Sequence, residues 1–216
     1  MTAAEIIETL WIWTPFLIGG FAWNILISLA AMLVGTLPGI VLARLRLAKR
    51  RSWVRASLMV TEFVRNIPTF VFLFYLAFLI PTEFAWGGQI YPFPAWLKAS
   101  LALSVAVVGF VSDTLYVAWR HWREGDHAAA LLFVPNWTGY LLIIVMASST
   151  ASVIGVDEIV ARCNVIIAAV GHDDLMLWIY LYAIAYFVLF CFPLNRAMEA
   201  LKNRMQAHAG SALSKK

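Results

Sequence analysis

The chain has 216 residues, of which 62% are hydrophobic and 13% are charged. Soluble domains are about half apolar and about one quarter charged, so this composition excludes an ordinary soluble protein and indicates an integral membrane protein. The net charge of +4 comes from short basic blocks between apolar runs, which reflects membrane topology and argues against a nucleic-acid partner.

Residues that carry catalytic or metal-binding chemistry are sparse. Cys163 and Cys191 have neither metal-ligand nor disulfide spacing. The histidines are scattered, and the chain contains no nucleophile elbow. The sequence therefore predicts no catalytic residue, no metal site and no cofactor, and an intramembrane enzyme has little support.

The N-terminal segment differs from the apolar runs that follow it. Residues 1–15 place apolar and aromatic side chains among acids and threonines, which predicts a short amphipathic helix at the membrane interface. Glu5 and Glu8 stand where a secretory signal would carry basic residues, so no cleavable signal is expected.

The first apolar run predicts a membrane span over residues 22–43. Within it, the four-residue spacing of Gly35 and Gly39 predicts the close approach of another helix, and a simple kink at Pro38 is the alternative. Six basic residues then crowd residues 44–55, which predicts a cytoplasmic loop.

The predicted second span, residues 56–80, contains a polar seam within its apolar run: Glu62, Arg65, Asn66 and Pro68. Unpaired polar groups cost several kcal/mol in hydrocarbon, so the seam must be buried in protein or line a wet cavity. Glu62 and Arg65 lie three residues apart and are expected to pair. Pro68 bends the chain, so the seam predicts a passage or a hinge. A helix that merely starts in the interface near Glu62 is the alternative.

The segment before the third span has no Lys or Arg and is rich in proline, glycine and aromatic residues, as expected of an outer loop with interface anchors. The third span is expected over residues 96–118, with Lys98 near its start and able to snorkel. Asp113 is either a substrate or gating residue, or an acid capped by Ser112, Thr114 or a neighbouring helix.

The fourth span is expected over residues 128–154, and its end carries hydroxyl side chains: Ser148, Ser149, Thr150 and Ser152. These residues could line a passage, but packing between membrane helices is the favoured role. In residues 155–174, apolar side chains recur at helical spacing and predict a short helix. The fifth span is expected over residues 175–194, and residues 195–216 form a basic tail.

The basic residues are distributed unequally between the predicted loops. Six lie in residues 44–55, two in 120–127 and five in the tail, whereas the opposite loops carry only Arg162. This asymmetry predicts five spans, with the N-terminus outside and the C-terminus in the cytoplasm. The expected fold class is an all-α integral membrane protein, in which residues 1–216 form a single transmembrane domain.

Two segments resemble the permease subunits of polar amino-acid ABC transporters. TEFVRNIPTFVFLFYLAFLIP, residues 61–81, resembles the second-span signature, in which an aromatic-rich stretch carries Arg-x-x-Pro and ends in Pro. SSTASVIGVDEIVARCN, residues 148–164, is similar to the stretch that follows the fourth span, with its best match over Ala151 to Glu158. Asp113 stands in place of the acid that the family carries in its third span.

The resemblance implies a type I ABC importer permease fold in the bacterial inner (cytoplasmic) membrane, crossing it several times. It further implies that the chain contacts membrane lipid, pairs with a like permease subunit as a homodimer or heterodimer, and receives solute from an external binding protein. A separate cytoplasmic ATPase would drive transport. Amino acids or similar small polar solutes are the implied substrates.

The chain departs from the family at two places. An ungapped comparison starting from Asp113 brings six residues onto the family's ATPase-coupling motif, Gly-Gln-x-Glu-Ala-Ala: Gly125, Asp126, His127, Ala128, Ala129 and Ala130. Ala128 replaces the glutamate, Val134 replaces a later glycine, and the loop is shorter by roughly two helical turns or more.

The second departure lies in the fourth span, where Met146 and Ala147 replace the usual Lys and Asp. These departures keep open an alternative function. In that alternative, the chain is a permease-derived structural or regulatory subunit that binds other membrane proteins in a larger complex and no longer couples to an ATPase.

Overall fold

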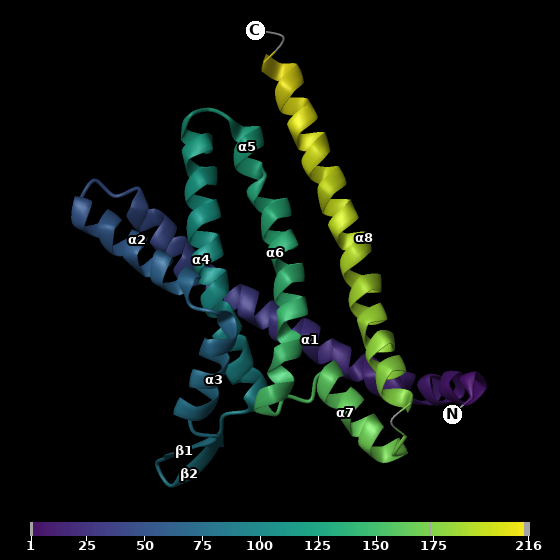
Figure 1. The fold of residues 1–216 in the computed structure, drawn as a ribbon. Coiled ribbons are helices and arrows are strands. Elements are labelled where there is room, and N and C mark those ends of the chain that lie inside the picture. The colour runs from purple at the N-terminus through teal and green to yellow at the C-terminus, as the bar shows by residue number, and fades with distance from the viewer. Residues whose placement is uncertain (1, 173, 214–216) are drawn as a thin grey trace.

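The computed structural model describes residues 2–172 and 174–213, and nearly all of them are helical (Figure 1). The helices are α1 (Ala3–Arg46), α2 (Arg51–Asn66), α3 (Thr69–Leu79), α4 (Ala95–Arg123), α5 (His127–Leu131), α6 (Phe133–Ala147), the 3-10 helix η1 (Ser148–Ile154), α7 (Ile159–Val170) and α8 (Asp174–Leu213). Strands β1 (Glu83–Trp86) and β2 (Gln89–Pro92) form an antiparallel hairpin between α3 and α4.

The described chain contains four helical segments that are long and apolar enough to cross a membrane: α1, α4, the segment from His127 to Ile154, and α8. The α2–α3 pair meets the same criterion when taken together, which raises the number to five if the pair is one span. The all-α membrane class expected from the sequence is confirmed.

The N-terminal residues do not form a separate interfacial helix. α1 runs without a break from Ala3 to Arg46, so residues 1–15 and the expected first span belong to one helix. Its start is stabilised by a capping box between Thr2 and Glu5. Within this continuous helix, Gly20 lets α7 approach closely: Ile159 Cα lies 2.8 Å from the position that a Cβ on Gly20 would occupy.

The expected second span is divided into two helices at right angles. α2 and α3 meet at a bend of 90°. Ile67 is extended and Pro68 precedes the first residue of α3, as expected because proline disfavours the helical conformation of the residue before it. The predicted bend is confirmed, and α2 begins at Arg51, inside the expected basic loop.

The predicted tail after the fifth span is also helical. α8 continues from Asp174 to Leu213 through Pro193, so the span and most of the tail are one helix. Residues 196–207 are rich in Ala, Leu, Lys, Arg, Glu, Gln and Met, which are strong helix formers. Arg196 and Glu199 add an ion pair along this surface.

Glycines in α1 bring α4 against it. A Cβ on Gly35 would meet the Ser104 carbonyl oxygen and lie 2.6 Å from Val107 Cβ, and a Cβ on Gly39 would lie 2.7 Å from Val111 Cβ. The close helix approach predicted from the spacing of these glycines is therefore confirmed. Pro38 lies within α1 without ending it.

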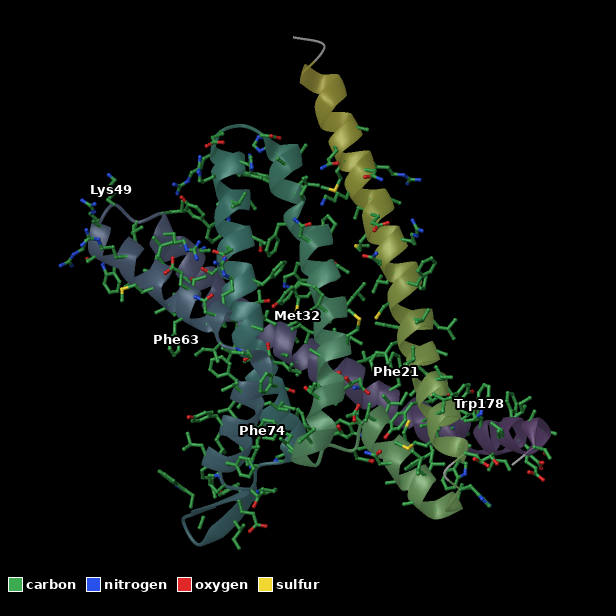
Figure 2. All side chains as sticks on the ribbon, in the orientation of Figure 1. Phe21, Met32, Lys49, Phe63, Phe74 and Trp178 are labelled. Carbon is green, nitrogen blue, oxygen red and sulfur yellow. The ribbon has the colours of Figure 1, made fainter. Side chains whose placement is uncertain are left out.

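Two apolar cores lie along α1 (Figure 2). The first contains the fully buried Met32 and joins α1 to α3, α4 and α6. The second contains Phe21, whose ring lies 5.2 Å from that of Phe187 and 5.7 Å from that of Phe190, both on α8. The short helix predicted in residues 155–174 is confirmed as α7, which packs into this second core.

Several elements end at two opposite ends of the molecule (Figure 1). The β1–β2 hairpin and α7 lie at one end, together with the N-terminus. The α4–α5 turn and the C-terminal end of α8 lie at the other.

Replacement of Gly35 by alanine tests the α1–α4 contact. The Cβ of Gly35→Ala would collide with backbone and side-chain atoms of α4, and we expect a loss of about 1–3 kcal/mol in the free energy of unfolding. Gly139→Ala in α6 is the matched control, because its Cβ would meet no atom within 4 Å. Thermal unfolding in a mild detergent should show a lower midpoint for the first variant only; equal midpoints would contradict the close contact.

Candidate functional site

Asp113 of α4 binds two arginines from two other helices. Arg46 Nη1 lies 2.7 Å from Asp113 Oδ1, and Arg65 Nη1 lies 3.2 Å from Asp113 Oδ2. The Arg46 side chain is 8% exposed and lies over the Tyr116 ring, whereas the Arg65 side chain is 64% exposed. These three charged residues, the Asp113 cluster, join α1, α2 and α4.

The expected pair between Glu62 and Arg65 does not form. Arg65 is in the last turn of α2 and reaches across to Asp113 on α4. Glu62 is exposed and makes no ion pair or hydrogen bond with a described residue. Asp113 is the better partner because it is only one-third exposed, and an ion pair in a less solvated position is screened less.

The alternatives for Asp113 are decided by its neighbours. Ser112 shares a hydrogen bond of 2.9 Å with Thr61, and the Thr114 hydroxyl donates to the Phe110 carbonyl oxygen, so neither hydroxyl caps Asp113. Neighbouring helices hold the acid instead. Because both arginines share this one carboxylate, the cluster carries an excess of positive charge.

Two cavities meet at Asp113 and Thr114. The first, about 270 Å³, lies at the α2–α3 break, where Arg65, Thr69 and Tyr140 line it. The second, about 290 Å³, lies between α4 and the α5–α6 segment and extends to His121 and Asn136. On α4, three polar residues line these cavities, and we call them the polar line of α4: Asp113, Thr114 and His121. Of the predicted seam, Asn66 and Pro68 are exposed at the break itself.

One wall of the first cavity is aromatic. The rings of Phe110 and Tyr140 stack with centroids 3.9 Å apart, and the Tyr140 hydroxyl donates to the Ala106 carbonyl oxygen over 3.3 Å. Met146 is 49% exposed further along the same segment, and neither it nor Ala147 supplies a charge. The charged groups of the two cavities therefore come from α2 and α4.

A buried network that the sequence analysis missed joins α1, η1 and α7. Asn24 Nδ2 lies 2.9 Å from both Ser148 Oγ and Glu158 Oε2, and its Oδ1 accepts a hydrogen bond from the Ile159 N–H. Glu158 caps α7 by accepting from the Ala161 N–H. The usable signals were an asparagine inside an apolar run and an acid just before one. Ser148 is fully buried, in agreement with the packing role favoured for it.

Burial raises the pKa of the Glu158 carboxyl above its ordinary value. Hydrogen bonds from Asn24 and from the Val160 and Ala161 amides lower this pKa, but their effect is smaller than that of burial. The remaining hydroxyls of η1 donate to carbonyl oxygens of their own segment: Ser149 to Met146, Thr150 to Ala147 and Ser152 to Ser149.

Lys98 does not snorkel to solvent as expected. It is 4% exposed, and its Nζ donates to the carbonyl oxygens of Ile80 at 2.7 Å and of Ala77 at 3.3 Å. Carbonyl groups at a helix C-terminus lack partners within the helix and attract a cation. Lys98 therefore ties the end of α3 to α4.

The residues matched to the coupling motif form a turn and one short helix. Gly125 has a φ of +86° and follows α4, and Asp126 caps α5 by accepting from the Ala129 N–H at 3.0 Å. The His127 ring lies 4.4 Å from that of Trp122, and Ala128, Ala129 and Ala130 complete most of the five-residue α5. Among the described residues, no group of three His, Cys, Asp or Glu side chains could hold a metal ion.

Comparisons with known proteins agree with this architecture at the level of fold. No family model matches the chain, and no curated protein matches it. The chain is similar to one from a crystal structure of an amino acid ABC transporter with histidines, with a TM-score of 0.75 and 15% identity. The match covers 94% of this chain and 99% of that one. The chain therefore shares the fold of that transporter chain.

Substitutions in the Asp113 cluster should separate its two arginines. Arg46→Gln leaves a poorly solvated carboxylate beside an exposed partner, and we expect a loss of about 3 kcal/mol in the free energy of unfolding. Arg65→Gln removes an exposed partner and should cost less than about 1 kcal/mol. Unfolding in detergent measures both; equal losses would mean that Arg46 is not the principal partner.

Removal of the Asn24 amide tests the buried network. Asn24→Leu leaves Glu158 without its side-chain donor and the Ile159 N–H without an acceptor, which should cost about 2 kcal/mol or more. Asn195→Leu is the control, because Asn195 bonds to Glu199 on an exposed surface. If both variants lose the same stability in thermal unfolding, the buried network does not stabilise the bundle.

Proposed function

We propose that the chain is a membrane-spanning subunit of an ABC-type importer for amino acids or similar small polar solutes. A second permease subunit would complete the pathway, an external binding protein would deliver the solute, and a separate ATPase would drive transport. The observation that carries this proposal is the fold, shared over 94% of this chain with a chain of an amino acid ABC transporter.

The polar line along α4 supports the proposal by offering a route for a polar solute. A passage through an apolar bundle needs groups that replace water around the solute, and intramembrane charged residues typically provide them. The cavity at the α2–α3 break is lined by Arg65, Thr69 and Tyr140. The second cavity is lined by His121 and Asn136. The excess positive charge of the Asp113 cluster favours a solute that carries a carboxylate.

We propose that the chain resides in the bacterial inner membrane. In the proposed orientation, the α4–α5 turn lies on the cytoplasmic side. The basic residues of the α1–α2 loop, the α4–α5 turn and the α8 tail support this orientation. The residues from Gly125 to Ala130 then present α5 to an ATPase, and the exposed Leu131, 48% accessible, offers it an apolar contact.

The alternative function is a permease-derived scaffold or regulatory subunit that binds other membrane proteins. The specific observation in its favour is the small size of the coupling surface. Only residues 124–126 separate α4 from α5, α5 has five residues, and Ala128 stands where the resembling family has glutamate. This surface offers a partner less area and less charge than the full family motif would.

A site-specific photocrosslink distinguishes the two functions. The full chain, expressed with its native partners, would carry benzoylphenylalanine at Leu131 in α5, and in a control at Val153, which is 65% exposed in η1. We expect an ATP-binding subunit to be crosslinked from position 131 and not from position 153. Crosslinks from position 131 only to other membrane proteins would overturn the importer function and support the scaffold.

A further inference from the structure

The β1–β2 hairpin projects from the end of the bundle where α3 ends and α4 begins (Figure 1). Its register pairs Phe84 with Tyr91 and Trp86 with Gln89. Gly87 and Gly88 form the two-residue connection, and both have a positive φ, as the tight turn of such a hairpin requires. The hairpin is thus a defined structural element within the outer loop expected from the sequence.

Every residue of the two strands is exposed in the isolated chain. Trp86 is 81% exposed, Ile90 67%, Tyr91 50% and Phe84 44%. A hairpin of two strands is marginally stable in water when nothing covers it. A hairpin with this much exposed apolar surface is therefore expected to be stabilised by contact with another apolar surface.

The aromatic residues of the two strands are concentrated on one face, whereas Ile90 lies on the other. Side chains alternate between the two faces of a strand, and directly paired residues share a face. Phe84, Trp86 and Tyr91 consequently lie together with Gln89, and we name these three aromatic residues the aromatic face. Glu83, the hairpin's charged residue, lies on the opposite face with its partner Pro92.

The position of the hairpin identifies what covers this face. Phe78 is 84% exposed and Leu79 76% exposed at the end of α3, so an exposed apolar surface adjoins the hairpin. The hairpin also adjoins the N-terminal end of α4, a helix that is long and apolar enough to cross a membrane. An element at the end of a membrane span lies at the depth of the lipid headgroups. Tryptophan and tyrosine are enriched at that depth because each joins an apolar ring to a polar group.

We propose that the β1–β2 hairpin is a membrane anchor whose aromatic face inserts into the lipid headgroup region. Lys98 already ties the last carbonyl groups of α3 to α4, and the anchor fixes the same end of α3 relative to the bilayer. α3 is then held at its C-terminal end, while its N-terminal end adjoins the break at Pro68. The anchor does not depend on transport activity or on an ATPase.

Spin-label accessibility tests the anchor in the full chain, reconstituted in phosphatidylcholine nanodiscs with Cys163 and Cys191 replaced by alanine. A nitroxide on Gln89→Cys reports on the aromatic face and replaces none of its aromatic residues, although it removes the hydrogen bond that the Tyr91 hydroxyl donates to Gln89 Oε1. A nitroxide on Ala85→Cys reports on the opposite face. Glu124→Cys, in the exposed α4–α5 turn, is the aqueous control.

We expect the ratio of oxygen to nickel-chelate accessibility at position 89 to exceed the ratios at 85 and 124 severalfold, because oxygen partitions into lipid. Equal ratios at 89 and 124 would place the hairpin in water and overturn the anchor. Low accessibility to both reagents at 89 would indicate a protein cover and also overturn it.

A second measurement needs no cysteine substitution. The tryptophan fluorescence of the native chain minus that of Trp86→Phe, the difference emission, reports on the exposed Trp86. Phosphatidylcholine brominated near its carbonyl groups should quench this difference emission strongly. A difference emission that is insensitive to brominated lipid would overturn the anchor, whatever the outcome of transport assays.

Discussion

A carboxylate within an apolar helix bundle is costly unless it is paired or hydrogen-bonded, and Asp113 is paired with two arginines. Arg46 contacts one carboxylate oxygen from the end of α1, and Arg65 contacts the other from the last turn of α2. Because the two arginines belong to different helices, the cluster joins three helices next to the break where the chain turns by 90° into α3. The bend is therefore stabilised by an ion-pair cluster beside it and by Pro68 within it.

Other buried polar groups of the bundle form hydrogen bonds around α1 and α4. Asn24 on α1 connects Ser148 and Glu158 at the start of α7, and Lys98 on α4 binds the terminal carbonyl groups of α3. Glycines of α1 bring α4 into close contact with it. These two helices form the frame of the molecule, and the cavities lie where α2, α3, α5 and α6 meet α4.

The polar line lies on α4, and the helix that follows the α4–α5 turn, α5, has only five residues. The fold agrees with that of an amino acid ABC transporter chain over nearly the whole length of both. Relative to the sequence pattern that the chain resembles, the differences lie at Ala128 in α5 and at Met146 and Ala147 in α6. The Arg-x-x-Pro bend and the segment around Glu158 agree with that pattern.

The sequence by itself determined the all-α membrane class, the bend at Pro68 and the helix contact at Gly35, because these depend on residue type and local spacing. It did not identify the partner of Arg65, since Glu62 and Asp113 are both acids in apolar runs, and only the packing of α2 on α4 brings Asp113 within 3.2 Å. Nor did it reveal the bond between Asn24 and Glu158, which are 134 residues apart. The tertiary structure decided these pairs because ion pairs and hydrogen bonds depend on distance in space, which separation along the chain does not determine.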